Sequence, residues 1–141
     1  MIFLVQTDTT AGLLSQNKTA LNAVKGRDAD QKLIRAVGSF TTLKKFARVP
    51  CAHRNLVRRS RGRSFVFPNG ESLRVVFGSH RRFFDRLEWA FSTSANRSGE
   101  RFDLEWAKSV SDCFVLRADG FRENAPSGII RLGRARRIKI R

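Results

Sequence analysis

The sequence predicts a single domain, residues 1–141, of mixed α and β structure (α/β or α+β) built on a mixed sheet. Its 141 residues suffice for one sizeable core but leave little room for a second. Hydrophobic residues make up 41% of the chain and twelve residues are Phe, so the chain should fold in spite of its charge. Strand and helix patterns alternate, and two hairpin signals require antiparallel pairs, which excludes a purely parallel doubly wound sheet.

The first half of the chain is predicted to alternate short strands with short helices. Asn17 is a typical N-cap residue ahead of a helix that carries Leu21 and Val24 on one face, and Gly26 ends that helix. The expected elements are a strand over Ile2–Val5, a polar turn over Gln6–Gly12, a helix over Lys18–Val24, a loop over Lys25–Lys32, a strand over Leu33–Val37 and a helix from Thr41 or Thr42 to about Ala47.

The second half contains the clearest hairpin signal, two β-rich runs over Ser64–Phe77 around Pro68-Asn69-Gly70. Six further elements follow it. They are a short helix over Arg81–Leu87, a strand over Trp89–Phe91, a polar loop over Ser92–Gly99, a helix near Asp103–Val110, a strand over Cys113–Leu116, and a hairpin of Gly128–Leu132 with Arg137–Ile140.

The chain is strongly basic, with 28 Lys and Arg against 12 Asp and Glu, a net charge of +16 and a pI near 11.6. One cluster consists of Arg54, Arg58, Arg59, Arg61 and Arg63, and a second of Arg131, Arg134, Arg136, Arg137, Lys139 and Arg141. An isolated charge run is usually a solvated face. An excess over the whole chain, rich in Arg, instead favours a phosphate-bearing partner, either a nucleotide or a nucleic acid.

Several classes of protein are excluded or disfavoured. No apolar run is long enough to span a membrane, and the N-terminus does not resemble a signal peptide, so we expect a cytoplasmic protein. The two Cys and two His have no zinc-ligand spacing, and no protein-bound metal is expected. We expect Cys51 and Cys113 to be buried and inert, and His53 and His80 to lie on the surface. Core positions are expected for Phe40, Phe65, Phe67, Phe83, Phe84 and Phe91.

Three polar loops directly follow predicted strands: Thr7–Thr10, Ser92–Asn96 and Pro126–Gly128. Small hydroxyl and amide side chains at strand ends suit the binding of phosphate or carboxylate. Taken alone, each loop has the composition of an ordinary helix cap or turn. Three of them in a basic chain, beside Lys25-Gly26-Arg27, predict a shared anion site. The common phosphate-binding and hydrolase motifs are absent.

Taken in order, these motifs resemble the YrdC/YciO family of threonylcarbamoyl-AMP synthases, from Gln6 to Arg141. The strongest piece is Ser92-Thr-Ser-Ala-Asn-Arg-Ser-Gly-Glu100; Lys25-Gly-Arg27 and Pro126-Ser-Gly-Ile-Ile130 are moderately specific. The resemblance implies an α/β fold, a YrdC-like twisted mixed sheet with antiparallel hairpins and flanking helices around a positively charged cleft.

The resemblance also implies an activity. Family members condense L-threonine, bicarbonate and ATP, as its magnesium complex, into threonylcarbamoyl-adenylate and pyrophosphate. A threonylcarbamoyl transferase complex then modifies tRNA next to the anticodon, and family members are associated with double-stranded RNA. The chemistry needs anions held together rather than a protein nucleophile, and the cationic and hydroxyl side chains of this sequence suit that need.

The residues that match the family's motifs have the following implied roles. The catalytic pair is Lys25 and Arg27. L-threonine would be bound by Thr7, Arg74, Ser92 and Ser127. The nucleotide would be bound by Arg27, Gln31, Lys32, Ser94, Asn96 and Arg141. For RNA, the basic cluster itself suggests Arg54, Arg58, Arg59, Arg61 and Arg63.

The sequence departs from the family's pattern at several places. Gln6 and Asp28 replace prolines, and the family's P-G-P-x-T stretch reads Arg61-Gly-Arg-Ser-Phe65. Two alternatives therefore stay open. One is a catalytically inactive family-like protein that binds double-stranded RNA or ribosomes, and the other is a basic protein unrelated to the family.

Overall fold

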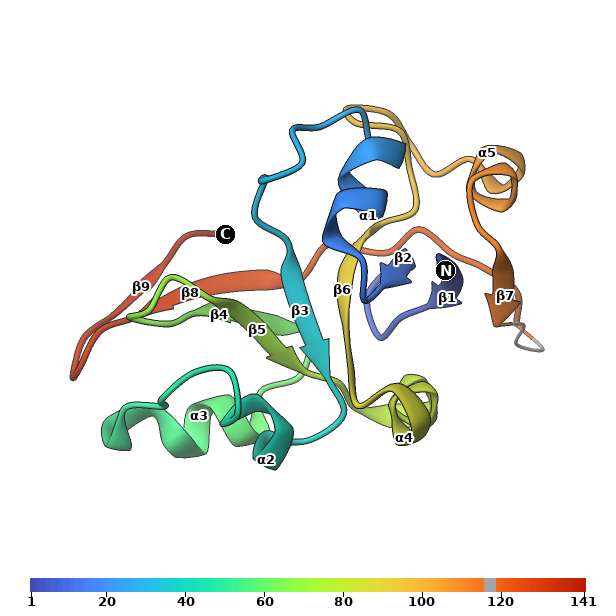
Figure 1. The fold of residues 1–141 in the computed structure, drawn as a ribbon. Helices are drawn as coiled ribbons and strands as arrows, with labels where there is room; N and C mark the ends of the chain where they lie inside the picture. Colours follow the sequence, from blue (N-terminus) through green and yellow to red (C-terminus); the bar gives the residue numbers. More distant parts are fainter. Residues whose placement is uncertain (116–118) are drawn as a thin grey trace. The chain divides into compact units, whose positions relative to one another are not determined.

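The computed structural model describes residues 1–115 and 119–141, which form two compact units (Figure 1). Unit 1 comprises Met1–Leu33 and Ala90–Ala125, and unit 2 comprises Ile34–Trp89 and Pro126–Arg141. Both units combine helices with mixed parallel and antiparallel strand pairs. No helix in the described part of the chain is long and apolar enough to cross a membrane.

The strands of unit 1 lie in the order β7-β1-β2-β6. Their bounds are Phe3–Gln6 for β1, Ala11–Ser15 for β2, Trp89–Ser94 for β6 and Cys113–Val115 for β7. β2 pairs antiparallel with both β1 and β6, whereas β7 pairs parallel with β1. The expected strand over Cys113–Leu116 is thus confirmed over its first three residues, and Leu116 lies outside the described residues.

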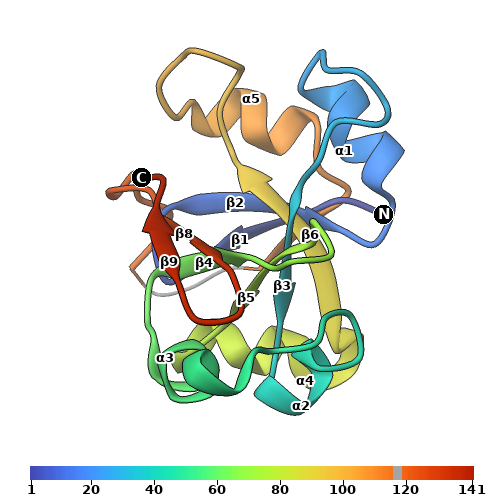
Figure 2. The ribbon, with the colours of Figure 1, turned by 90° about the vertical axis from the view of Figure 1, so that its left-hand side faces the viewer.

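Two helices, α1 (Lys18–Val24) and α5 (Leu104–Ser109), lie on the same side of β1 and β2 (Figure 2). The bounds of α1 are those predicted, because the Asn17 side chain accepts a hydrogen bond from the Ala20 N–H (3.0 Å) and fixes the first turn. Buried Leu21 and Ala107 pack with apolar residues of the two strands, which gives unit 1 its core.

The strands of unit 2 lie in the order β3-β5-β4-β8-β9. Their bounds are Ile34–Val37 for β3, Arg63–Val66 for β4, Ser72–Val75 for β5, Gly128–Leu132 for β8 and Arg137–Lys139 for β9. β3 pairs parallel with β5 and β4 parallel with β8, while β4–β5 and β8–β9 are antiparallel. Both predicted hairpins are therefore confirmed.

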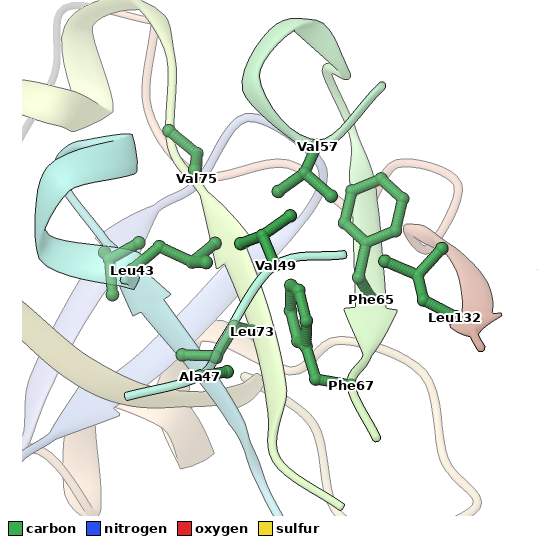
Figure 3. Packing of buried hydrophobic residues seen from close by; sticks show 10 residues of the cluster. Leu43, Ala47, Val49, Val57, Phe65, Phe67, Leu73, Val75 and Leu132 are labelled. Carbon is green, nitrogen blue, oxygen red and sulfur yellow. The ribbon is translucent and has the colours of Figure 1, made fainter. Parts of the chain in front are cut away.

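Helices of unit 2 cover its core. They are α2 (Phe40–Leu43), a 3₁₀ turn η1 (Cys51–His53), α3 (Arg54–Arg59), a 3₁₀ turn η2 (Gly78–Phe83) and α4 (Phe84–Leu87). Figure 1 shows α2 and α3 on the same side of β4 and β5. In the close-up of Figure 3, Phe65 of β4 lies between Val57 of α3 and Leu132 of β8. All three side chains are at most 2% exposed, so they form the centre of this core.

Three expectations about local structure are wrong, and one helix is absent from the predicted elements. β2 is a strand that the sequence reading missed, since the polar turn ends at Thr10 and buried apolar residues follow it. Ser92–Ser94 belongs to β6 rather than to a loop, because it pairs with β2. α2 begins at Phe40, where the Ser39 hydroxyl caps it, and ends four residues before Ala47. No helix is predicted in the Arg-rich stretch that forms α3.

The expected burial of the histidines and cysteines is also wrong. His53 and His80 are each only 4% exposed. His80 stacks on Phe83 and meets Phe84 edge-on, so aromatic packing outweighs its polarity. Cys51 and Cys113 are exposed, because one begins a surface 3₁₀ turn and the other lies on the outermost strand of unit 1. The expected core positions are confirmed for Phe65, Phe67 and Phe84, which are buried, and for Phe40 and Phe91, which pack partly buried against the cores. Phe83 is partly buried against His80 and Phe84.

Candidate anion-binding site

Lys25 is the best-defined residue of the predicted site. It caps the C-terminus of α1 and is only 5% exposed. Its ammonium donates to the carbonyl oxygens of Ser94 (3.0 Å) and Asn96 and lies 3.4 Å from Asn96 Oδ1. The Ser98 hydroxyl donates to the Lys25 carbonyl (3.0 Å). Lys25 and the residues Ser94 and Asn96, which belong to two separate motifs of the sequence, therefore lie together in unit 1.

The surroundings of Lys25 make it an unusual cation. Burial, followed by repulsion from the nearby Arg27 guanidinium, lowers its pKa from 10.5 to about 8. The neighbours that accept its hydrogen bonds are neutral amide oxygens, and the Trp106 ring lies 5.9 Å from its nitrogen. No carboxylate among these neighbours cancels its charge, so the ammonium favours an incoming anion.

The turn after α1 positions Arg27. Gly26 has a φ of +63°, a left-handed conformation that glycine adopts without strain. The Arg27 N–H then donates to the Asn22 carbonyl (2.9 Å), which holds the turn closed. The Asn22 amide donates to the carbonyls of Ala29 (3.0 Å) and Gln31 (2.9 Å) and so orders the following loop. Sequence reasoning missed Asn22, whose only signal was a polar residue on the apolar side of a helix.

Gln31 and Lys32 lie in the same loop and are both exposed. The Gln31 N–H donates to the Asp28 carbonyl (3.0 Å), an ordinary turn contact. Within residues 1–115, neither side chain has a described hydrogen bond to Lys25, Ser94 or Asn96. Their predicted contact with a nucleotide thus stays a prediction.

Thr7 and Ser92 are placed by strands β1, β2 and β6. The Thr7 hydroxyl, at the end of β1, donates to the Thr10 carbonyl (2.6 Å) and accepts from the Thr9 N–H (3.2 Å), which closes the turn into β2. A side chain at Gly12 would place its Cβ 2.8 Å from Thr7 Cγ2, so glycine is needed there. Ser92 is half-buried opposite Leu14. The Thr7 hydroxyl is thus engaged in the turn between β1 and β2.

Unit 2 contains the remaining predicted ligands of threonine and nucleotide. Arg74 lies on β5, 7% exposed, in register with Ala36 of β3. Ser127 is buried just before β8, with its hydroxyl 3.1 Å from that of Ser64. The Arg141 guanidinium donates through Nε (3.1 Å) and Nη2 (3.0 Å) to the Ser127 carbonyl. Ser127 and Arg141 are therefore neighbours, and Ser64 is a buried partner that no sequence motif indicated.

The five arginines predicted to bind RNA are divided between two elements. Arg54, Arg58 and Arg59 are exposed on α3, where the Arg58 guanidinium lies 4.9 Å from the Phe40 ring centre. Arg61 and Arg63 are exposed at the start of β4. Within residues 1–115 and 119–141, no group of three or more His, Cys, Asp or Glu side chains is placed to hold a metal ion.

No family model matches the sequence, and no curated protein matches it either. Solved structures do match. P. abyssi Sua5 complexed with L-threonine aligns over 99% of this chain and 49% of its own, at 20% identity and a TM-score of 0.82. E. coli YciO aligns over 99% of this chain and 82% of its own, at 15% identity and a TM-score of 0.78. A HypF structure in the phosphate- and nucleotide-bound form aligns over 99% and 26%, at 17% identity and a TM-score of 0.73.

The chain spans about half the length of the Sua5 chain that it matches. Identities of 15–20% over nearly the whole chain, with TM-scores of 0.73–0.82, describe a common architecture. The predicted mixed α/β class is confirmed. The chain has the fold of Sua5, YciO and part of HypF, which is the YrdC-like fold that its motifs resemble.

Proposed function

We propose that this protein is a threonylcarbamoyl-AMP synthase, which makes threonylcarbamoyl-adenylate from L-threonine, bicarbonate and ATP. The observation that carries the proposal is the buried Lys25 ammonium, held by the Ser94–Asn96 segment and followed by the Gly26–Arg27 turn. The fold likeness to a Sua5 structure that contains L-threonine supports it.

The reaction fits the residues. The amine of threonine attacks bicarbonate, water leaves, and the resulting carbamate attacks the α-phosphate of ATP while pyrophosphate departs. No step requires a protein nucleophile. Lys25 and Arg27 would stabilise the negative charge on the phosphoryl oxygens and on pyrophosphate, with Ser94 as a neutral donor. Asn96, whose amide donates to the carbonyls of Arg97 and Glu100, would hold the Lys25 ammonium beside the nucleotide. ATP would enter as its magnesium complex.

Further ligands are proposed by motif. Thr7, Arg74, Ser92 and Ser127 would bind threonine, and Arg74 would hold its carboxylate. Gln31, Lys32 and Arg141 would contact the nucleotide. The product would pass to a threonylcarbamoyl transferase complex that modifies tRNA in the cytoplasm.

The test is pyrophosphate release from ATP, measured with and without L-threonine and bicarbonate. Lys25→Met and Arg27→Gln should each lower the rate about a hundredfold or more, as the loss of a transition-state donor does. Lys108→Met is the matched control, because this partly exposed lysine of unit 1 makes a long ion pair of 3.9 Å with Glu105. Wild-type rates in both site variants would refute the assignment.

A second candidate is a protein of the same fold that binds double-stranded RNA or ribosomes without making the adenylate. The net charge of +16 and the exposed arginines of α3 favour it. This candidate would be selected if L-threonine and bicarbonate do not raise pyrophosphate release above the background rate while the protein binds RNA tightly and in a salt-sensitive way.

A further inference from the structure

β9 (Arg137–Lys139) is the outermost strand of unit 2. In the part of the chain that the structure describes, β9 pairs with β8 alone, and this antiparallel pairing sets Ile138 opposite Arg131 and Lys139 opposite Ile130 (Figure 1). All three residues of β9 are exposed. One side of its backbone is therefore free to pair with a further strand.

The hairpin geometry shows which backbone groups of β9 face outward. The Ile140 N–H, just after the strand, donates to the Ile129 carbonyl (2.8 Å). In an antiparallel pair, the backbone groups of successive residues point alternately toward the partner strand and away from it. Ile138 therefore faces β8 as Ile140 does, and the N–H and C=O groups of Arg137 and Lys139 point away from β8.

One face of this edge is apolar. Ile138 and Ile140 are 61% and 50% exposed, although isoleucine is among the residues most often buried. Alternate residues of a strand share a face, so these two side chains lie together. Ile129 lies two residues before Arg131, the partner of Ile138, so it is on the same face, where it is partly buried. The three isoleucines form an apolar strip along the edge.

The opposite face is cationic. Arg137 and Lys139 line a cavity of about 560 Å³ together with Arg61, Arg63 and Arg141. No carboxylate lines this cavity, and within residues 1–115 and 119–141 none of the five cations makes a described ion pair with an acidic side chain. The face therefore favours acidic side chains, and the cavity has room for them.

We propose that β9 docks an extended acidic segment of another protein, which adds to the sheet as a further strand. The backbone of that segment would pair with the outward groups of Arg137 and Lys139. Its side chains would alternate between the two faces, so that apolar residues cover Ile138 and Ile140 while Asp or Glu residues reach the cationic face. The partner is thus an alternating apolar and acidic sequence.

A second copy of this chain is a poorer occupant of the edge. If two β9 strands paired with one another, basic side chains would lie opposite basic side chains, and like charges directly opposite one another destabilise a sheet. An acidic segment turns this repulsion into attraction. The inference goes beyond the proposed function, because none of the proposed ligands of threonine or nucleotide lies within β9.

The test measures the exchange of backbone amides with solvent by NMR, on the full ¹⁵N-labelled chain with and without a capped peptide of alternating Glu and Val. In the free protein the amides of Arg137 and Lys139 should exchange rapidly, whereas that of Ile138 should be protected by β8. Saturating peptide should slow exchange at Arg137 and Lys139 about tenfold or more and leave the rate at Ile138 unchanged.

Reversal of the charges on β9 tests the acidic character of the partner, with peptide binding measured by fluorescence anisotropy. Arg137→Glu with Lys139→Glu should bind the acidic peptide at least about tenfold more weakly and should gain affinity for a peptide of alternating Lys and Val. The matched control is Arg81→Glu with Arg82→Glu, two exposed arginines of η2 outside the cavity lining. It should bind the acidic peptide within about twofold of wild type. Thermal melts verify that each variant is folded.

Several outcomes overturn the inference. Binding of the peptide is absent, or it occurs without protection of Arg137 and Lys139. A peptide with the same Glu and Val residues in two blocks binds equally well, which would mean that charge alone attracts it. The control variant loses as much affinity as the β9 variant. A uridine oligomer gives the same protection as the peptide, or the two amides are already protected in the free protein because it dimerises.

Discussion

The lowered pKa of Lys25 predicts how anion binding depends on pH. The free protein carries this ammonium in a buried position beside Arg27, with its pKa at about 8. An ordinary lysine keeps its charge until about pH 10.4. If the charge of Lys25 attracts the nucleotide, affinity must fall as the pH rises through 8.

The size of the effect follows from the charged fraction. With a pKa of about 8, Lys25 is roughly nine-tenths charged at pH 7, half at pH 8 and one-tenth at pH 9. The dissociation constant of a non-hydrolysable ATP analogue should therefore be nearly constant below pH 7 and rise about tenfold between pH 7 and 9. Isothermal titration calorimetry at fixed ionic strength measures this profile.

Two variants isolate the contribution of Lys25. Lys25→Met should bind weakly at every pH and lose the break near pH 8. Lys25→Arg keeps its charge throughout the range, so its profile should be flat. A wild-type affinity that is constant to pH 9.5, or that falls only near pH 10, would refute the reasoning.

The same shift has a consequence for stability. The folded-state pKa of about 8 lies below the unfolded value of 10.5, so the unfolded chain binds more protons between these two pH values. The contribution of Lys25 to the free energy of unfolding should therefore increase with pH across this window. Urea unfolding of wild type and of Lys25→Met, compared at pH 8 and pH 10, measures the difference.

Three further predictions concern the scaffold, and urea denaturation measures each. Asn17→Ala should cost about 1 kcal/mol by removing the cap that accepts from Ala20, and an unchanged midpoint would exclude a role for this cap. Gly26→Ala should cost about 1–2 kcal/mol because of the positive φ alone, since no atom lies within 4 Å of the added Cβ; Gly26→Asn should cost less, and equal costs would contradict the argument. Phe65→Ala should cost about 3–5 kcal/mol by opening a cavity in unit 2, and a loss below 1 kcal/mol would mean that the core can collapse around it.

Local chemistry made part of the fold predictable. Asn17 fixes the start of α1, and Gly26 with its positive φ fixes its end, so both bounds could be predicted from single residues. The Pro68-Asn69-Gly70 turn likewise fixed the β4–β5 hairpin. Such caps and turns depend on a few neighbouring residues, so the structure contains them as predicted.

Long-range pairing was not predictable in this way. Ser92–Ser94 has the composition of a loop and becomes strand only because β2, about eighty residues earlier, supplies its hydrogen-bond partners. His80 has a polar side chain, but its burial depends on the packing of two phenylalanine rings. Cys51 is exposed because its 3₁₀ turn lies on the surface, and the residue type does not determine that position.

The candidate site likewise contains residues that motifs predict and residues that motifs do not predict. The motifs brought Lys25, Ser94 and Asn96 to attention, and the structure places them in contact. Asn22 and Ser64 have no motif, and only their burial and hydrogen bonds reveal them. The meeting of Arg61 and Arg63 with Arg137 and Lys139 depends on the parallel pairing of β4 with β8, which sequence spacing does not reveal.

The most direct test of the proposed function is the fate of labelled bicarbonate. The wild-type protein is incubated with ATP, L-threonine and ¹³C-bicarbonate, and the products are separated rapidly and weighed by mass spectrometry. We predict an adenylate that carries both threonine and the labelled carbon, formed in step with pyrophosphate and lost in Lys25→Met. Unchanged ATP and threonine after incubation with folded protein would contradict the account.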